Sequence, residues 1–342
     1  MAQTSTATVS RVLSNKPGVT EEKRQRILQI AQRVGYSPNR IAKNLSLKKS
    51  HVFGFIAADI RNMAYVEFFH RIQALAREIG YQVHIADSEQ DVEKERVNIG
   101  LMREHRAEGL IVFPVHDWHT GSDLDHFLQL KLQRFPFVLV GRAEGYGFDS
   151  VVSEEIPTAM ELTRHLLGLG HRRIGFLGAE DDNRCIAERV EGTRRALSEA
   201  GLELRPSDTI ALRDEWKDEF KELLSRRERP TAFVCVNDVW AMMAYRPIRE
   251  LNLSIPGDIS LVSFGNNLWS EHLIPALTTS VERSREIAET AMAILLRRLE
   301  DPTVPPMQES VGQDIRLRES TAPPPGNVSP ARAGGKRVAR SG

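Results

Sequence analysis

Residues Ser5-Thr-Ala-Thr-Val-Ser-Arg-Val-Leu-Ser-Asn15 form a short segment that is rich in Ser and Thr and carries one arginine, Arg11. Val9, Val12 and Leu13 recur at helical spacing and predict one apolar stripe. The opposite face presents small, hydrogen-bonding or bidentate groups that suit base edges in the DNA major groove. They are Thr6, Ala7, Ser10 and Arg11. The segment predicts the recognition helix of a helix-turn-helix, although an amphipathic helix with a polar outer face would show the same pattern.

Charge is spread unevenly along the 342 residues, although the total is zero. Residues 1–50 hold ten Lys or Arg and two Asp or Glu, and residues 321–342 hold four basic residues and no acidic one. Residues 51–320 therefore carry 32 basic and 44 acidic residues, a net charge of −12. A basic head on an acidic body indicates that the head meets a polyanion. The helical organisation of the head favours nucleic acid over an anionic membrane.

The composition argues against secretion and against several kinds of site. Cys185 and Cys235 are too far apart for a C-x-x-C motif, so we interpret them as two reduced core thiols of a cytosolic protein. The chain shows no apolar run of the roughly 18 residues that a membrane span needs, and no signal-peptide apolar region. We therefore expect a cytoplasmic protein without membrane contact.

No motif for catalysis or cofactor binding stands out. Gly168-Leu-Gly170-His171 resembles half of a dinucleotide fingerprint but follows a predicted helix, so we interpret it as a helix-to-strand turn. His116-Asp-Trp-His119 has two histidines, a weak signal for a metal site, and no Cys/His set has zinc spacing. We expect no cofactor, no metal and no catalytic residues.

The rest of the head also predicts helices. A Lys-Pro-Gly turn precedes Thr20, a predicted N-cap, and the acidic Glu21 and Glu22 complement the dipole of a second helix. This helix ends near Gly35. Its predicted core face is Ile27, Leu28, Ile30, Ala31 and Val34.

A third, short helix is predicted after Pro38, with little core of its own. It carries Arg40, Lys43 and Leu45. Two interpretations remain open. The segment is either an ordinary linker helix or a helix that folds only on DNA, with Leu45 as a wedge in the minor groove.

From residue 52 the pattern changes to alternating strands and helices, which predicts mostly parallel sheets covered by helices on both faces. The first set has strands at Val52–Ala58, Tyr81–Ala86, Gly109–Val115 and Phe137–Gly141, with helices near 68–79, 91–106 and 122–133. The second set has strands at Ser150–Ser153, Arg173–Gly178, Thr209–Leu212, Ala232–Val236 and Ile259–Phe264, with helices at 157–168, 184–200, 216–227 and 239–250. A helix at 283–300 and a strand at 309–318 are expected to return across the lobes.

Two α/β sets of similar size predict two lobes with a ligand cleft between them. Ligands of such sheets lie at the carboxyl ends of the strands. The polar residues just after predicted strands are Asp59, Arg142, Asn237, Asp238 and Asn266.

Several motifs in series resemble the lactose/galactose-repressor family of bacterial transcription regulators. In the head they are Thr-Val-Ser-Arg-Val-Leu-Ser at 8–14, Val19-Thr20, and Gly35-Tyr-Ser-Pro-Asn-Arg40-Ile-Ala42. In the body they are Asp59-Ile-Arg-Asn62, His165–Ile174, Glu188-Arg-Val-Glu-Gly192, Val236-Asn-Asp238 and Pro275–Thr279. The resemblance covers about residues 4–320. It implies a helix-turn-helix head, a hinge helix and a periplasmic-binding-protein-like core that binds a small effector.

The family usually acts as a homodimer on a near-palindromic operator. The resemblance implies that Thr6, Ala7 and Arg11 read bases. Phosphate contacts are implied for Ser5, Thr8, Ser10, Thr20, Asn39 and Arg40, and Ala42 and Leu45 would meet DNA from the hinge helix.

In the core the resemblance implies effector contacts for Arg189 and Asn237. A surface ion pair of Arg189 with Glu188 or Glu191 is the alternative. Trp216 would either stack on a sugar face or pack at a helix start. Asp59, Tyr65 and Arg142 are weaker candidates from the first lobe, and Asn266 and Glu282 complete the predicted set.

The sequence departs from the family in three places. The family head begins with one more helix, about ten residues that precede the first residues here. We expect a chain without that helix to bind DNA poorly. Phe264-Gly-Asn-Asn267 lacks the usual acidic residues, and Glu282 replaces a common glutamine. Glu282 would either face the cleft, favouring a cationic or polyhydroxy ligand, or cap a helix.

The fold class expected is an all-α helix-turn-helix head, N-terminally truncated, plus a two-lobe α/β core with parallel sheets. We divide the chain into a partial helix-turn-helix domain (1–36), a hinge helix and linker (37–50), an effector-binding core (51–320) and a disordered basic tail (321–342). The function expected is an effector-responsive transcriptional regulator, more specifically a repressor, that binds operator DNA as a homodimer. A solute-binding protein without DNA binding and a cleft enzyme are the alternatives.

Overall fold

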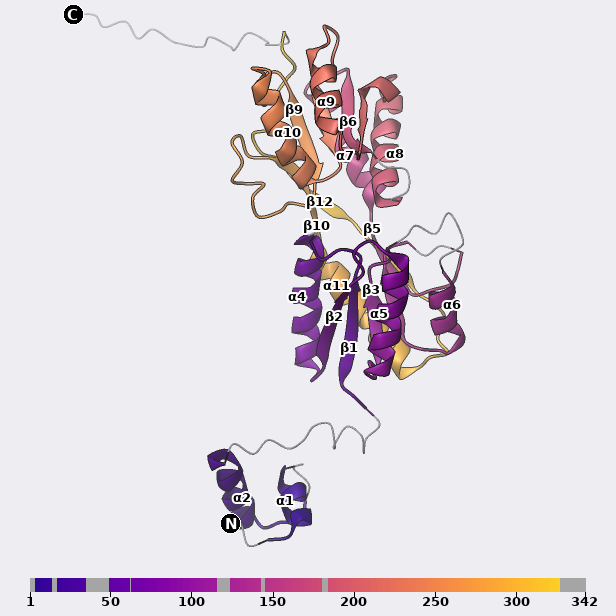
Figure 1. Ribbon diagram of the computed structural model, residues 1–342, viewed down its shortest axis with the longest axis vertical. Coiled ribbons are helices and arrows are strands. Elements are labelled where there is room, and N and C mark those ends of the chain that lie inside the picture. The colour runs from indigo at the N-terminus through magenta and orange to yellow at the C-terminus, as the bar shows by residue number, and fades with distance from the viewer. Residues whose placement is uncertain are drawn as a thin grey trace, which may run out of the picture. The chain divides into compact units, whose positions relative to one another are not determined.

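The computed structural model describes residues 4–13, 17–34, 49–61, 63–115, 124–142, 145–179 and 184–326. The chain forms two compact units, Met1–His51 and Val52–Gly342 (Figure 1). Within the described ranges, no helix has the length and apolarity that crossing a bilayer requires.

The head contains two packed helices, α1 (Thr6–Leu13) and α2 (Glu21–Arg33). Val12 of α1 and Ile27 of α2 are buried, with 3% and 4% of their surface exposed, which confirms the predicted apolar stripe of α1. Thr20 stands at the N-cap position of α2 as predicted, although its side chain makes no capping hydrogen bond.

Two of the residues predicted for the core face of α2 are exposed to solvent. Leu28 and Val34 are 40% and 67% exposed. The eight-residue α1 covers only one side of the thirteen-residue α2, so the apolar residues beyond that side stay in contact with solvent.

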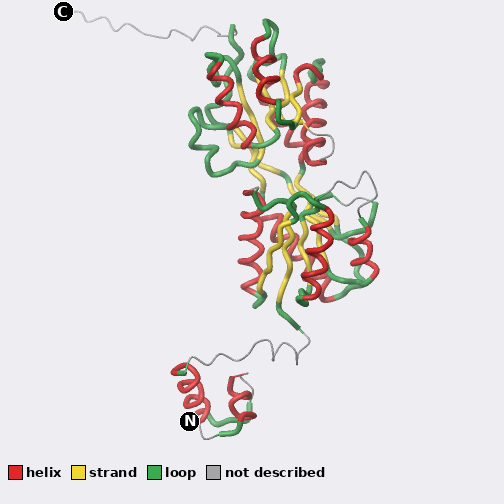
Figure 2. Tube along the Cα trace, in the orientation of Figure 1, coloured by secondary structure: helices red, strands yellow, loops and turns green. Residues whose placement is uncertain are grey.

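The second unit contains two six-stranded sheets, each with helices on both faces (Figure 2). In the first lobe the strand order is β11-β5-β4-β3-β1-β2, and all described pairs are parallel. The strands are β1 (Val52–Ala57), β2 (Gln82–Asp87), β3 (Gly109–Val112), β4 (Phe137–Val140), β5 (Ser150–Ser153) and β11 (Gln308–Val311). The helices are α4 (Met63–Glu78), α5 (Val92–Glu104), α6 (Asp125–Leu132) and α11 (Ser284–Glu300).

The second lobe has the strand order β12-β10-β9-β8-β6-β7, in which only the β10–β12 pair is antiparallel. The strands are β6 (Ile174–Ala179), β7 (Thr209–Ala211), β8 (Ala232–Cys235), β9 (Ser260–Phe264), β10 (Thr278–Glu282) and β12 (Gln313–Arg316). The helices are α7 (Glu155–Gly168), α8 (Arg184–Glu199), α9 (Trp216–Ser225) and α10 (Asp238–Glu250), and a short 3₁₀ turn spans Pro206–Asp208.

The apolar sequence of β1 explains its central place in the first sheet. Phe53 and Phe55 pack with α4 and α11 on one face, and Ile56 packs with residues of α5 and α6 on the other. Gly54 lets Leu110 pack closely against β1, because a Cβ there would lie 2.4 Å from Cδ2 of Leu110 and would force that side chain to move. Strands that are buried on both faces have continuous apolar sequences, which is why strand β1 could be predicted from the sequence.

Three of the sequence-based assignments need correction. Ser150–Ser153 was assigned to the second set but pairs with β4 and β11 in the first lobe. The single strand expected at 309–318 is two strands, β11 and β12, in different sheets with only Gly312 between them. Strand β10 was not predicted, because its buried residues Thr278, Thr279 and Ser280 are polar.

The C-terminal boundary of the core also lies later than predicted. The hydroxyl of Thr321 lies 3.0 Å from Nε2 of His165, and the backbone N–H of Ala322 donates to Oγ of Ser260. Both residues therefore belong to the second lobe. The tail prediction for 327–342 lies outside the described residues.

Candidate functional site

Three chain crossings join the two lobes and bring polar residues together between them (Figure 1). Strand β5 leads into α7, β10 leads into α11, and β11 leads into β12. We use the name interlobe cluster for Ser153, Glu155, Arg189, Glu282 and Gln313. These residues come from the ends of the crossing strands and from α7 and α8.

Arg189 is the central cation of the interlobe cluster. Its Nε donates to Oε2 of Glu155 at 2.7 Å, and its Nη1 donates to the carbonyl of Val236 at 2.6 Å. The guanidinium carbon lies 4.4 Å from the ring centroid of Phe264, a cation–π distance. The predicted alternative, an ion pair with Glu188 or Glu191, does not form among the described contacts. The carboxylate of Glu155, on the preceding helix α7, holds the arginine instead.

Close packing of α7 against α8 explains why Arg189 and Glu155 meet. A Cβ at Gly192 would lie 2.5 Å from the carbonyl oxygen of Ile156, so only glycine permits this approach. Gly192 stands three residues after Arg189, on the same side of α8. The spacing R-x-x-G therefore places a guanidinium opposite the first turn of α7.

Glu282 faces the same cluster. Burial, followed by the negative charge of Glu155, raises the pKa of Glu282 to about 7, while Arg189 and a hydrogen bond from Ser153 oppose that rise. Helix α11 begins only at Ser284, with Arg283 at the N-cap position. These contacts favour the cleft-facing alternative for Glu282 over the helix cap.

An ion pair links the two lobes beside the interlobe cluster. Arg142 follows β4 in the first lobe, and its Nε lies 2.6 Å from Oε1 of Glu188 on α8 in the second lobe. Arg184, one turn earlier on α8, donates to the same oxygen at 2.9 Å. Arg142 therefore lies at the lobe boundary, as its position after a strand predicted.

Asn237 and Asp238 follow β8, where the first caps helix α10 and the second holds the loop after β9. Oδ1 of Asn237 accepts from the N–H of Trp240, so the asparagine caps α10. The fully buried carboxylate of Asp238 accepts from the hydroxyls of Ser263, Ser270 and Thr279. It also accepts the N–H of Asn267 at 2.6 Å. Asp238 has no remaining role for a ligand and serves to position the loop.

The remaining predicted core residues have varied surroundings. Oδ1 of Asn266 accepts from Arg318 at 2.7 Å. Asp59 is held by Arg61 in a bidentate pair at 2.8 Å, and this hydrogen bonding lowers the pKa of Asp59 despite partial burial. Tyr65 packs edge-on against Phe113, and burial raises the pKa of its hydroxyl.

Trp216 belongs to the apolar core of the second lobe. It is 5% exposed, and its ring centroid lies 4.9 Å from that of Trp240. This burial favours the helix-start packing alternative over stacking on a sugar.

In the head, the exposed face of α1 carries Ala7, Ser10 and Arg11, and Ser5 is exposed just before it. The hydroxyl of Ser5 lies 3.0 Å from that of Thr8, which is half-buried. Thr20 is exposed at the start of α2. The side chain of Thr6, and the predicted DNA contacts at Asn39, Arg40, Ala42 and Leu45, lie outside the described residues.

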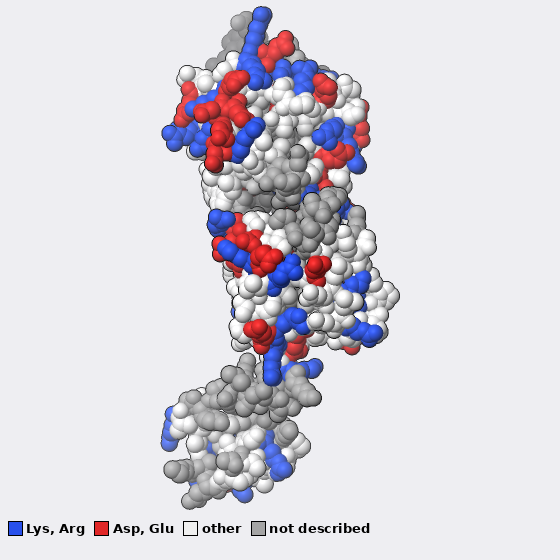
Figure 3. All heavy atoms as spheres, turned by 45° about the vertical axis from the view of Figure 1, so that its right-hand side comes forward, with Lys and Arg blue, Asp and Glu red and all other residues white. Residues whose placement is uncertain are grey.

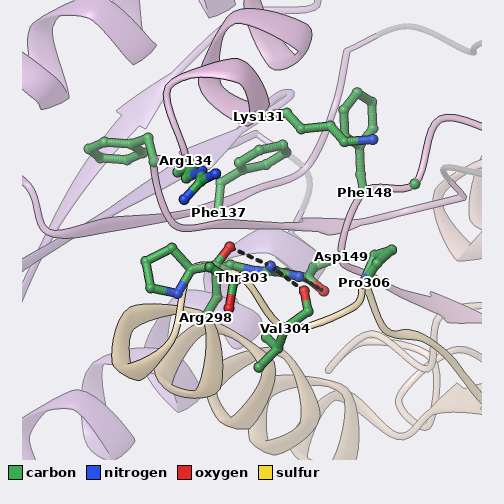
Figure 4. A pocket seen from close by; sticks show the side chains of 12 residues that line it. Lys131, Arg134, Phe137, Phe148, Asp149, Arg298, Thr303, Val304 and Pro306 are labelled. Carbon is green, nitrogen blue, oxygen red and sulfur yellow. Dashed lines mark hydrogen bonds and ion pairs between the residues drawn. The ribbon is translucent and has the colours of Figure 1, made fainter.

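A pocket of about 320 Å³ lies in the first lobe, among α6, the start of β4 and the loop after α11 (Figure 4). Arg298 spans its floor, donating to Asp149 at 2.7 Å and to the carbonyls of Pro302 and Val304. These partners occupy the guanidinium, so we interpret the arginine as a clamp on the loop between α11 and β11. None of the predicted site residues lines this pocket.

Sequence reasoning missed Ser153, Glu155, Glu188 and Gln313 as members of the site. Glu155 opens α7 and Gln313 opens β12, 158 residues later, and their side chains are hydrogen-bonded at 3.1 Å. Nothing local in the sequence pairs two such positions. The usable signal was Glu188, which directly precedes the R-x-x-G motif and was considered only as a surface partner of Arg189.

Comparisons with known proteins agree with this geometry. A family model described as bacterial regulatory proteins, lacI family, matches residues 1–39, and one described as periplasmic binding protein-like domain matches residues 163–321. A protein described as the transcriptional repressor PurR of Aliivibrio salmonicida is 29% identical over 312 residues, which cover 88% of this chain and 90% of that protein.

Solved structures give the same result. The crystal structure of a protein described as a ribose operon repressor from Burkholderia thailandensis is 30% identical, with a TM-score of 0.68, and the match covers 78% of this chain and 99% of that one. A lac repressor dimer bound to operator and an anti-inducer is 22% identical, with a TM-score of 0.82, over 94% of this chain and 96% of that one. The second likeness is one of fold.

Proposed function

Because this chain belongs to the lacI family of bacterial regulatory proteins, we propose that it is a transcriptional repressor whose affinity for operator DNA is set by a small polar effector. The effector would bind between the two lobes of the core, against the interlobe cluster. The protein would act in the cytoplasm, where the chromosome is. The proposed parts remain the head at 1–36, a hinge at 37–50 and the effector-binding core that follows.

The observation that carries the proposal is the outer face of α1. Its inner side packs through Val12 on α2, so that Ala7, Ser10 and Arg11 are left exposed together. We propose that Ala7 and Arg11 contact bases, with Thr6 beside them, and that Ser5, Thr8, Ser10 and Thr20 contact phosphates. Asn39, Arg40, Ala42 and Leu45 stay proposed DNA contacts of the hinge.

The interlobe cluster supports the effector part of the proposal. Arg189 offers a guanidinium that suits hydroxyl pairs or a carboxylate. Glu282 adds a carboxylate whose raised pKa shows that its charge is poorly compensated in the free protein. A ligand with several hydrogen-bond donors, such as a polyhydroxylated or amine-bearing metabolite, would compensate that charge. Asn237, Asn266, Asp59, Tyr65 and Arg142 would complete the proposed contacts.

Exposed apolar side chains support a homodimer. Leu268 and Ile274, in the loop between β9 and β10, are 80% and 92% exposed. Val97 and Leu101, one turn apart on α5, are 58% and 45% exposed. The view in Figure 3 shows acidic and basic side chains mixed over one face of the core. A second copy would cover the apolar residues, and its two-fold symmetry would match a near-palindromic operator.

Catalysis is not part of the proposal. Burial raises the pKa of the Cys185 thiol although the charge of Arg189 opposes the rise, and a raised pKa favours the thiol over the nucleophilic thiolate. An effector recovered from the protein should be chemically unchanged.

Selection from a library of random DNA duplexes tests DNA recognition. We expect the protein to enrich a near-palindromic sequence and to bind it about 10³-fold or more tightly than a scrambled duplex. A thermal-shift screen of sugars, purines and amino acids tests effector binding. The Arg189→Met variant should lose the shift, whereas Arg195→Met, an exposed position on the same helix, should keep it.

A further inference from the structure

The side-chain amide of Gln313, which follows one of the three crossings between the lobes, is hydrogen-bonded to residues of the other two. Its Oε1 accepts from the hydroxyl of Ser280 on β10 at 2.6 Å. Its Nε2 donates to Oγ of Ser153, the last residue of β5, at 2.9 Å, and to Oε1 of Glu155, the first residue of α7, at 3.1 Å. Gln313 itself opens β12 directly after the β11–β12 crossing. Figure 1 shows these strands meeting where the two lobes join.

These contacts join two strand pairs that belong to different sheets. At the boundary, β5 pairs with β11 in the first lobe and β10 pairs with β12 in the second. The N–H of Glu154 extends the first pair by donating to the carbonyl of Val311. Across the boundary, the amide of Gln313 links the second pair to the end of the first. Among the hydrogen bonds of Gln313, the one to Ser153 runs from the second lobe to the first, so a rotation of one lobe against the other has to strain or break it.

The same amide also contacts the two residues that hold the charged groups proposed to bind the effector, Arg189 and Glu282. Glu155 accepts from Gln313 with one oxygen and from Arg189 with the other. Ser153 accepts from Gln313 and hydrogen-bonds Glu282. A group that draws Arg189 away from Glu155 would thereby change the hydrogen bonds of the three crossings.

We propose that Gln313 is a positioning residue that couples the effector-binding Arg189 to the three chain crossings between the lobes. The role of Arg189 in effector binding rests on the proposed function. The hydrogen bonds by which Gln313 links the crossings are present in the free protein. Glutamine suits this role because one neutral side chain supplies both the acceptor for Ser280 and the donors for Ser153 and Glu155. The charged groups that face it are Glu155, Glu282 and Arg189.

Native-state hydrogen exchange on the full chain, without DNA or ligand, tests whether the hydrogen bonds of Gln313 stabilise the three crossings. In Gln313→Leu, we expect the protection of peptides from 150–156, 278–284 and 309–317 to fall together by about tenfold. Peptides from β1 and β8 should keep their protection. Gln129→Leu, at an exposed position on α6, is the matched control and should change none of them.

The Gln313→Glu variant supplies a rescue. A protonated carboxyl can still accept from Ser280 and can donate one hydrogen bond, one fewer than the amide, whereas a carboxylate beside Glu155 can only accept. Protection of the three segments should therefore be closer to that of the wild type at pH 5 than at pH 8, after correction for the wild-type profile.

Two outcomes would overturn the proposal. One is unchanged protection in Gln313→Leu, and the other is a loss confined to the peptide that contains residue 313. If that variant does not fold, Ser153→Ala and Ser280→Ala each remove one of the hydrogen bonds and should lower protection in the same three segments. Because no operator or effector is used, a negative result here leaves the proposed function to its own tests.

Discussion

Arg142 and Glu188 form an ion pair across the lobe boundary, with Nε and Oε1 2.6 Å apart. Their side chains are 25% and 11% exposed, so solvent screens the pair only in part. Glu188 also holds Arg184, so loss of Arg142 would not leave the carboxylate without a cation. The pair therefore ties the lobes together without being the sole support of either partner.

A double-mutant cycle measures how strongly this pair joins the lobes. For Arg142→Met and Glu188→Gln, urea unfolding should give a coupling free energy of about 0.5–1 kcal/mol. The pair of Arg164 and Glu199 is the control, because both side chains are 54% exposed and both lie in the second lobe. Its coupling should be smaller. If the two cycles gave equal coupling free energies, the position of the Arg142–Glu188 pair at the lobe boundary would not strengthen it.

Glu282 should make stability depend on pH. Its pKa is about 7 in the folded protein and near 4.5 when the chain unfolds, so the folded state binds more protons between these values. Stability from this group is complete below about pH 4.5 and is lost as pH rises through about 7. The loss should reach at most about 3 kcal/mol.

The matched variant for this prediction is Glu282→Gln, which cannot ionise. The free energy of unfolding of the variant, measured against that of the wild type by urea titration from pH 5 to pH 8, should rise with pH. A difference that stays constant over that range would contradict a raised pKa at Glu282.

Asp149 and Arg298 form the most buried ion pair of the first-lobe pocket (Figure 4), with side chains 4% and 15% exposed. Asp149 also accepts the N–H of Met307, at the start of the chain's return into β11. Arg298→Met would leave this carboxylate without its cation and should cost about 3–5 kcal/mol. Chemical denaturation should show a far smaller effect for Arg285→Met, whose side chain is 76% exposed.

Arg11 should determine base preference in the head. Once an operator has been selected, Arg11→Ala should lose about 1–3 kcal/mol of discrimination at one base pair of each half-site. Arg26→Ala, at an exposed position on α2, should change affinity for all sequences alike or leave it unchanged. Binding titrations against operators with single base-pair changes separate the two. Intact discrimination in Arg11→Ala would remove the base-reading role from α1.

The sequence predicted the fold well where burial is apolar and continuous. Strand β1 and the helices that cover it follow from the run Val52–Ala57 and the helical periodicity after it. Strand β10 was not predicted, because its buried residues are polar. Hydrogen bonds to neighbouring groups, rather than apolar packing, hold Thr278, Thr279 and Ser280 in the interior. A pattern of polarity alone cannot distinguish such a strand from a loop.

The candidate site was predicted in its parts but not in its connections. Arg189 follows from a motif, and Glu282 from its place in the family pattern. Glu155 and Gln313 gain their importance only from the folded chain, because the crossings bring positions 153, 155, 280 and 313 into one hydrogen-bonded group. Contacts of such long range depend on sheet topology, which local spacing does not encode.

Control of DNA binding by an effector is the central claim, and one titration tests it most directly. The operator obtained by selection is titrated with the protein at fixed salt, with and without a saturating amount of the compound found by thermal shift. We predict a change in operator Kd of about 5–150-fold, and an equal change in the affinity for the compound when operator is bound. An operator Kd that is the same with and without the compound would contradict the account.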